Sequence, residues 1–94
     1  MVAVDKGVLL IAEPFMKDKN FTEARKWVKN NIDTDVNQLY NEFYENSGEY
    51  FDVRYVPALI TLIAKYQYQN AFSANPEINF AAFCAEVMLN VEFA

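Results

Sequence analysis

The sequence predicts an all-α fold, a compact bundle of about five helices that forms a single domain over residues 1–94. Apolar residues recur at spacings of three and four along most of the chain, which is the period of an amphipathic helix. Capping residues and prolines stand just before several of these segments, where helices begin. The chain has neither a fixed repeat nor a linker-like stretch, and 94 residues is an ordinary length for one domain.

The first segment, over residues 5–16, has the least regular pattern. Its apolar side chains fall at helical spacing and are Val8, Leu9, Ala12, Phe15 and Met16. Asp5 is a candidate cap, and Pro14 is expected to end or kink the helix because proline lacks a backbone N–H. Val2 and Val4 alternate with small or charged residues, so a short strand at the start of the chain stays open as an alternative.

A second helix is predicted to begin at Asn20 and to end at Asn30 and Asn31. The run from Asn20 to Glu23 is close to a capping box, with Asn in place of Ser or Thr. One face of this helix is apolar and consists of Phe21, Ala24, Trp27 and Val28. The cations Arg25, Lys26 and Lys29 point elsewhere and stand toward the C-terminal end, where the helix dipole favours positive charge.

A third helix, the most regular in the chain, is predicted to start at Asp33 with Asp35 in its first turn. Its apolar face has the spacing of an amphipathic helix and consists of Val36, Leu39, Tyr40, Phe43 and Tyr44. Asn46, Ser47 and Gly48 are expected to stop it, since Gly48 is able to take a left-handed conformation. Residues 49–55 are too apolar for a free loop, so we expect them to pack on the bundle or to extend a neighbouring helix.

Pro57 predicts the first turn of a fourth helix, because a proline at that position forfeits no intrahelical hydrogen bond. The main apolar stripe of this helix consists of Leu59, Leu62, Ile63 and Tyr66. Ile60, Ala64 and Tyr68 are expected to widen that stripe. Polar residues from Gln67 to Asn70 mark the end of the helix.

The fifth predicted helix is apolar nearly all the way round. Asn75 is a good N-cap, Pro76 suits the first turn, and Glu77 complements the positive end of the helix dipole. One apolar stripe consists of Ile78, Ala81, Ala82, Ala85, Met88 and Leu89. A second stripe consists of Phe80, Cys84, Val87 and Val91. The polar residues Asn79, Glu86 and Asn90 form a single narrow line, interrupted by Phe83, which we expect to be the wet face.

Two apolar stripes require two partners. Either the last helix is central in its own bundle, or its second stripe binds another chain, and the periodicity leaves both alternatives open. In the second case the candidate subunit interface consists of Phe80, Phe83, Cys84, Val87 and Val91. Leaving Phe80, Phe83 or Val87 exposed would cost roughly 1.5–3 kcal/mol each, which favours a covered position for all three.

The residue inventory argues against catalysis. The chain has no histidine, which removes Ser-His-Asp and Cys-His arrangements and most zinc sites. Its only cysteine, Cys84, lies between apolar neighbours and is interpreted as a small buried residue. Neither Gly7 nor Gly48 belongs to a phosphate-binding loop. We therefore expect no enzyme activity, no catalytic residue, no cofactor and no metal site.

The remaining polar groups have ordinary structural interpretations. The basic cluster consists of Lys17, Lys19, Arg25, Lys26 and Lys29, and the net charge of the chain is −5. This balance argues against a large nucleic-acid surface, and the cluster is interpreted as a solvated helix face. Glu42 and Glu45 could pair, although a solvated face is favoured. Core or interface packing is preferred to base stacking for Tyr40, Tyr44, Tyr66 and Tyr68.

The chain carries no membrane or export pattern. Its longest apolar run extends from Val8 to Ala12, far short of the ~18 residues that a membrane-spanning helix needs. The first residues lack the basic and apolar regions of a signal peptide. We expect a soluble, cytoplasmic chain with no membrane contact.

Three segments stand in a specific order: "MKDKNFTEARKWVKNN", "DTDVNQLYNEFYEN" and "VPALITLIAKYQYQNAFSANPEINFAAFCAEVM". In helix order and caps they resemble the C-terminal collar domain of replication factor C-type clamp-loader ATPase subunits, most closely those of phage clamp loaders. The resemblance covers roughly residues 5–89. It rests on helix order, caps and the final "ANPEINFAAFCAEVM", without a catalytic signature.

The resemblance implies a subunit-oligomerisation module of a DNA-replication sliding-clamp loader. In that family the collar domains hold the ATPase subunits in a ring, and the final helices pack against neighbouring subunits. The ATP-binding loop, Walker B carboxylates, arginine finger and sensor residues lie upstream of the collar and have no counterpart here. The expected partners are other clamp-loader subunits, identical or different, in the cytoplasm or in the host cytoplasm for a phage protein. The sliding clamp and DNA would be reached only through the missing upstream domains.

The alternative function is a stand-alone helical adaptor that binds a partner helix or peptide in an apolar groove. A small all-α enzyme is a third alternative, which the absence of histidine and of a glycine-rich loop disfavours.

Overall fold

The chain folds into a bundle of helices, which confirms the all-α prediction. The computed structural model describes residues 7–31 and 35–94, without the side chains of residues 7, 8 and 10. The elements are α1 (Gly7–Lys17), α2 (Phe21–Asn31), α3 (Val36–Glu45), α4 (Ser47–Tyr50), the 3-10 turn η2 (Val53–Tyr55), α5 (Val56–Asn70) and α6 (Pro76–Asn90). Val2, Val4, Asp5 and Asp33, to which a strand, a cap and a helix start were assigned, lie outside the described residues.

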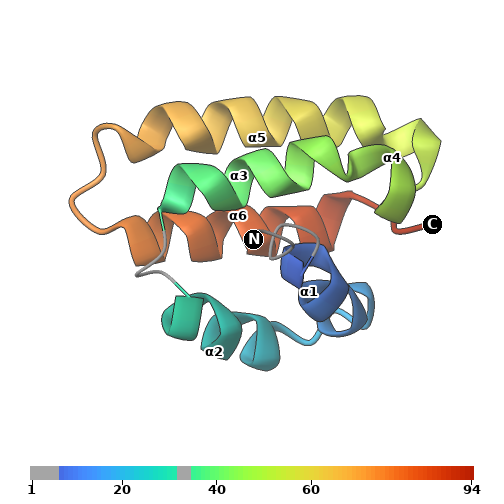
Figure 1. Cartoon of the computed structure of the whole chain (residues 1–94), viewed down its shortest axis with the longest axis horizontal. Helices are drawn as coiled ribbons and strands as arrows, with labels where there is room; N and C mark the ends of the chain where they lie inside the picture. The colour runs from blue at the N-terminus through green and yellow to red at the C-terminus, as the bar shows by residue number, and fades with distance from the viewer. Residues whose placement is uncertain (1–6, 32–34) are drawn as a thin grey trace.

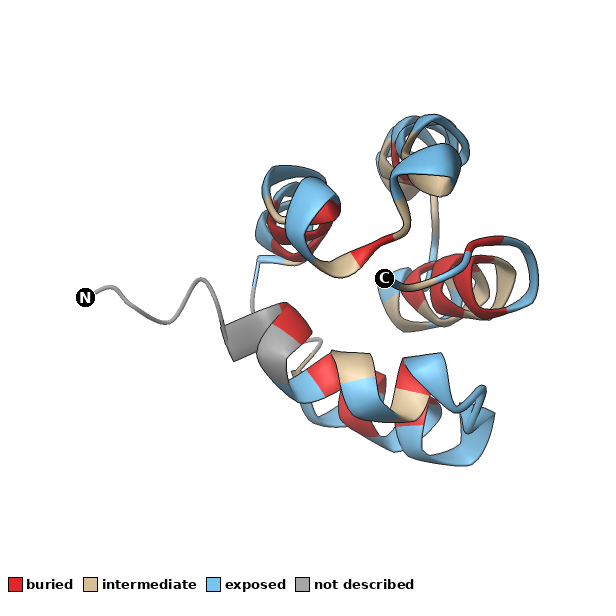
Figure 2. Ribbon diagram, turned by 90° about the vertical axis from the view of Figure 1, so that its right-hand side faces the viewer, coloured by how far each residue is buried: buried red, intermediate tan, exposed pale blue. Residues whose placement is uncertain are grey.

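The helices surround one core, and α6 contacts α1, α2, α3 and α5 (Figure 1). α5 and α2 pack on opposite sides of α6. α1 also contacts α6, and the corner between α1 and α2 reaches the C-terminal half of α6. α3 lies against α1 and α5 and reaches α6 through aromatic side chains. Figure 2 shows the buried positions of the helices turned mostly toward the middle of this arrangement.

Side-chain caps start three of the helices. The Asn20 side chain accepts a hydrogen bond from the Glu23 N–H (3.2 Å) at the start of α2, as predicted. The Asn75 side chain accepts bonds from the N–H groups of Glu77 (3.0 Å) and Ile78 (3.3 Å) at the start of α6, also as predicted. α3 is capped by Asp35, whose carboxylate accepts from the Asn37 N–H (3.0 Å), so this helix begins later than expected.

Two details of the predicted helix ends differ, although α3 does stop at Asn46 as predicted. Of the two outcomes expected at Pro14, an end of the helix is wrong: α1 continues to Lys17, and the Asp18 N–H bonds the Pro14 carbonyl (3.2 Å). Gly48 does not adopt a left-handed conformation. It lies inside the short helix α4, which starts directly after the Asn46 cap of α3.

The stretch after α4 packs on the bundle, as expected from its apolar composition. Phe51 is buried and forms an isolated antiparallel bridge with Phe93, with the two rings 4.4 Å apart. This bridge ties the end of the chain to the α4 corner. α5 then starts at Val56, with Pro57 in its first turn as predicted.

The apolar stripe of α5 is narrower than predicted. Leu59, Ile63 and Tyr66 are buried. Ile60, Ala64 and Tyr68, which were expected to widen the stripe, are exposed because only one side of α5 meets α3 and α6.

The α1–α2 corner is closed by a lysine in the position that usually holds glycine. The Lys19 N–H donates to the Met16 carbonyl (3.0 Å), and the Asn20 N–H donates to the Phe15 carbonyl (2.8 Å). This pair of bonds is the Schellman arrangement, whose closing residue is left-handed. Lys19 accordingly has a φ of 59°.

The centre of the core is a cluster of aromatic rings from α3 and α6. Phe83 makes edge contacts with Tyr40 (5.2 Å between ring centroids) and Phe43 (5.1 Å). Phe80 makes edge contacts with the same two rings, at 5.1 Å and 6.1 Å. Such edge-to-face pairs contribute about 0.5–1.5 kcal/mol beyond the burial of their area.

The predicted subunit interface is therefore wrong in its residues. Phe80, Phe83, Cys84, Val87 and Val91 are all at most 1% exposed, and they form the inner face of α6. A neighbouring subunit could reach them only if the bundle opened. The other alternative, a last helix central in its own bundle, agrees with this burial.

Replacing Phe83 by Ala is expected to lower the free energy of unfolding by about 3–5 kcal/mol, because it removes a fully buried ring and leaves a cavity. Urea denaturation followed by circular dichroism measures the change. Ile78→Ala on the same helix is the control. Its side chain is exposed, so a loss below about 1 kcal/mol is expected. Equal losses from the two variants would contradict this orientation of α6.

Candidate interaction surface

The outer side of α6 carries an exposed apolar stripe. It consists of Ile78, Ala82, Ala85 and Leu89, which follow one another at helical spacing. Ile78 is 66% exposed and Leu89 is 75% exposed, while the two alanines are half-buried. These four residues belong to the stripe that the sequence pattern assigned to the core. The interface alternative placed Phe80 and Val87 against a neighbouring subunit and the stripe of Ile78 and Leu89 in the core. The structure has the reverse arrangement, with Ile78 and Leu89 exposed and Phe80 and Val87 buried.

The polar line of α6 helps to explain this orientation, because two of its residues form hydrogen bonds with neighbouring helices. The Asn79 amide donates to the Tyr40 hydroxyl (3.0 Å) and to the Tyr66 carbonyl (2.9 Å). About two turns further along α6, Glu86 accepts hydrogen bonds from the Tyr66 hydroxyl and from the Lys65 ammonium (3.2 Å). Two residues of the predicted wet line, Asn79 and Glu86, thus form a polar seam that joins α6 to α3 and α5, although the Glu86 side chain stays 33% exposed. The third residue, Asn90, is exposed as predicted.

The seam shifts the ionisation of its members. Burial raises the pKa of the Tyr40 hydroxyl, an effect that the hydrogen bond from Asn79 partly offsets. Burial and then the bond to Glu86 raise the pKa of Tyr66 to about 12. The same bond from Tyr66, with help from Lys65, lowers the pKa of Glu86. Near neutral pH both tyrosines are therefore neutral: Tyr66 donates to the ionised Glu86 carboxylate, and Tyr40 accepts from Asn79.

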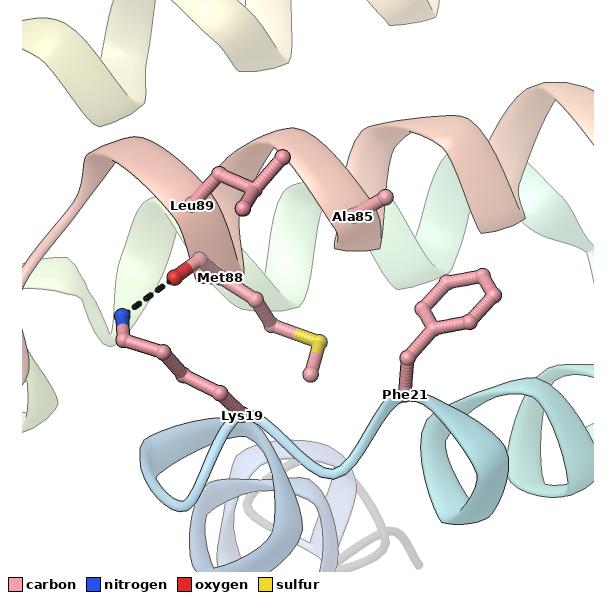
Figure 3. Close-up of a pocket in the computed structure, with 5 residues that line it drawn as sticks. All are labelled: Lys19, Phe21, Ala85, Met88 and Leu89. Carbon is pink, nitrogen blue, oxygen red and sulfur yellow. Dashed lines mark hydrogen bonds between the residues drawn. The ribbon is translucent and has the colours of Figure 1, made fainter.

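A small apolar notch lies beside the C-terminal half of the stripe, between α2 and α6 (Figure 3). Its volume is about 160 Å³, and its lining consists of Lys19, Phe21, Ala85, Met88 and Leu89. Phe21 is 42% exposed and faces the notch from the start of α2. The Lys19 ammonium donates to the Met88 carbonyl, one of the last carbonyls of α6, and so closes one side of the notch.

A basic groove adjoins the notch, with Phe21 lining both. Its volume is about 320 Å³, and its lining consists of Phe21, Thr22, Arg25, Lys26, Lys29 and Glu77. Three cations from α2 thus face one carboxylate at the start of α6. Lys26 pairs with Glu23 at 3.5 Å, both being largely exposed, so this pair adds little stability.

The groups considered for chemistry are dispersed. Cys84 is free and fully buried, and burial raises the pKa of its thiol, which suits a packing role. Glu42 is buried and accepts from Gln38 (3.1 Å), whereas Glu45 is exposed, so the two carboxylates do not share a face. Tyr40 and Tyr66 lie in the core, as favoured for the tyrosines, while Tyr44 and Tyr68 are exposed.

Within residues 7–31 and 35–94, His, Cys, Asp and Glu form no group of three that could hold a metal ion. Over the same part of the chain, each helix is too short or too polar to cross a membrane.

Sequence reasoning missed the two features that shape this surface. Phe21 was placed on the apolar face of α2, yet its side chain, in the first turn beside the C-terminal half of α6, is 42% exposed. Lys19 carried no sign of its left-handed backbone, since lysine is rare in that conformation. The cap residue Asn20, which directly follows Lys19, was only a weak indication of the turn.

The polar seam predicts a pH dependence. The pKa of Glu86 is lower in the folded protein than in the unfolded chain, so the stabilisation is complete above the unfolded value of about 4.3 and is lost as the pH falls through the folded value. Glu86→Gln removes this titration. We expect the wild-type advantage over this variant, less than about 1 kcal/mol for so exposed a pair, to shrink between pH 6 and pH 3.

Urea denaturation at both pH values measures that difference. Tyr66→Phe removes the main donor to Glu86 and is expected to reproduce part of the effect. A wild-type advantage independent of pH would refute the role assigned to Glu86.

Because the backbone of Lys19 is left-handed, we expect glycine to be tolerated at this position better than alanine. Lys19→Gly and Lys19→Ala both lose the bond to the Met88 carbonyl, but only glycine adopts a φ of 59° without strain. The glycine variant is therefore expected to be the more stable by about 1 kcal/mol in thermal or urea unfolding. At Lys17, in the last turn of α1, the same two substitutions are expected to rank in the reverse order. The same ranking at both positions would exclude strain at Lys19.

Comparisons of the chain with protein-family models, with curated proteins and with solved structures found no match. The resemblance to clamp-loader collar domains therefore stays a prediction from the sequence.

Proposed function

We propose that this chain is a subunit-oligomerisation module without catalytic activity, and that the outer stripe of α6 is the main contact surface. The exposed apolar stripe is the observation that carries this proposal. A helix with a fully packed inner face has no need of Ile78 and Leu89 on its outer face for folding. Burying each of these side chains in a contact would contribute roughly 1.5–3 kcal/mol.

The shape of the surface favours subunit packing over the adaptor alternative. A partner helix bound in a groove inserts several side chains along the length of the groove. The notch beside Leu89 measures about 160 Å³, close to the ~150 Å³ of a cavity that holds one benzene molecule. It can receive one side chain from a neighbour. The rest of the stripe is a convex helix surface, which suits packing against another helix.

The finer assignment, a collar domain of a replication factor C-type clamp-loader subunit, is supported by the sequence resemblance. The helical fold and the exposed outer stripe are compatible with it. Under this assignment the stripe of Ile78, Ala82, Ala85 and Leu89 takes the role that was first given to the inner face. The partners would be other clamp-loader subunits, and the chain would contact the sliding clamp and DNA only through domains upstream of the collar.

Sedimentation equilibrium of the 94-residue chain over a wide concentration range tests the proposal. Reversible self-association is expected. Leu89→Gln is expected to weaken it at least tenfold, because a loss of about 1.4 kcal/mol corresponds to a factor of ten in the dissociation constant. Glutamine is a good helix former, so the variant keeps α6 intact.

Tyr68→Gln is the matched control. Tyr68 is 71% exposed, as Leu89 is 75% exposed, but it lies on α5 away from the stripe. Its replacement is expected to leave the association constant within about twofold. A wild-type chain that stays monomeric at all concentrations, or equal losses from the two variants, would overturn the proposal.

A further inference from the structure

Charge is unevenly distributed along this acidic chain. Residues 17–29 contain five cations and two carboxylates, whereas residues 35–52 contain five carboxylates and no cation. The chain as a whole has a net charge of −5, so the basic region is a local exception. Separation of this kind on one small domain creates two surfaces of opposite sign.

The basic surface is the groove along α2. Arg25 and Lys29 are exposed and stand one helical turn apart, so they share a face. Lys26 contributes a third cation to the groove, beside its pair with Glu23. Glu77, from the first turn of α6, is the one carboxylate that lines the groove.

The acidic surface is at the α4 end of the bundle. Glu45 and Glu49 are exposed at the junction of α3 and α4, and Glu92 is exposed on the neighbouring C-terminal segment, whose backbone carbonyl bonds the Asp52 N–H (3.0 Å). Two cations lie beside this group: Arg54, which Asp52 holds at 2.7 Å, and Lys17, whose ammonium donates to the Ala94 carbonyl (3.0 Å). The charges of Arg54 and Asp52 cancel, and the three carboxylates outnumber Lys17, so this end is negative on balance.

The two surfaces lie toward opposite ends of the molecule, whose longest extent is 33 Å (Figure 1). The C-terminal end of α2 and the start of α6 are at one end, and α4 with the chain terminus is at the other. Screening over about 8 Å at physiological ionic strength separates them electrostatically within one molecule. Neither surface therefore neutralises the other within one molecule.

We infer that copies of this chain associate through two different faces, with the basic groove of α2 on one copy receiving the acidic α4 end of the next. The inference rests on the proposed oligomerisation and specifies its partner surface. A self-complementary contact at the groove would oppose its three cations to the same three cations of the partner, and like charges across an interface repel. The α4 end, with Glu45, Glu49 and Glu92 exposed, offers carboxylates for those cations.

A charge-swap experiment on the whole chain tests the inference. The groove variant is Arg25→Glu with Lys29→Glu, and the end variant is Glu45→Lys with Glu49→Lys. All four side chains are exposed, so circular dichroism is expected to show both variants folded. Each variant alone is expected to self-associate at least tenfold more weakly than wild type in 50 mM salt. An equimolar mixture is expected to recover association to within threefold of wild type, because the reversed groove then meets the reversed end.

The outcomes separate the two proposals. Leu89-dependent association of wild type, together with charge variants that associate as tightly as wild type, would overturn the two-face inference and leave the oligomerisation proposal standing. A loss in the groove variant that the mixture does not restore would also overturn it. A monomeric wild type would overturn the oligomerisation proposal itself. The control Gln69→Glu adds a negative charge at an exposed position of α5 outside both surfaces and is expected to leave association unchanged.

The same variants test a different occupant of the groove. A fluorescent 20-base-pair DNA duplex titrated into wild type is expected to show no binding at 150 mM salt, because the net charge of the protein is negative. Binding of the duplex that the groove variant abolishes would overturn the inference and assign the groove to nucleic acid.

Discussion

The contact between the aromatic rings of α3 and α6 determines the rest of this structure. Phe80 and Phe83 on α6 meet Tyr40 and Phe43 on α3 edge to face, and all four rings are fully buried. Large rings on one side of a helix set its rotation about its axis, because no other orientation buries the same area. Once that side of α6 faces inward, the positions of its remaining residues follow from helical geometry.

The polar seam makes this orientation more specific than packing alone would. Tyr40 belongs both to the aromatic cluster and to the seam, since its hydroxyl accepts a bond from Asn79. Rotating α6 to bury Ile78 and Leu89 would break the bonds of Asn79 and separate Glu86 from Tyr66. Buried polar groups without partners cost about 1–3 kcal/mol each, so the alternative rotation is penalised on both counts.

The outward apolar stripe is a consequence of these two inward demands. With aromatic residues on one side of α6 and the polar seam on its flank, the remaining side contains only small or aliphatic residues. Exposed aliphatic side chains in a row are typical of a contact surface. The opposite charges of the α2 groove and the α4 end lie toward opposite ends of the molecule, where they can both orient a partner and strengthen its contact.

The sequence by itself determined the helical class, most helix positions and the N-caps of α2 and α6. These features depend on spacing and on side chains that bond to backbone within three residues, so they are local. It also indicated that α6 must be covered on more than one side. Sequence patterns failed at the start of α3, where Asp33 and Asp35 were both candidates and Asp35 is the cap. They located the stop of α3 at Asn46 but not the short helix α4 that contains Gly48.

Only the tertiary structure decided which stripe of α6 faces inward. Both stripes satisfy helical periodicity, and a polar line such as Asn79 and Glu86 normally indicates solvent. The choice depends on the hydroxyls of Tyr40 and Tyr66, which are 39 and 20 residues away in the chain and reach the line only after folding. The physical reason is that periodicity measures the hydrophobicity of a face, whereas burial depends on which partners can pack against it and satisfy its polar atoms.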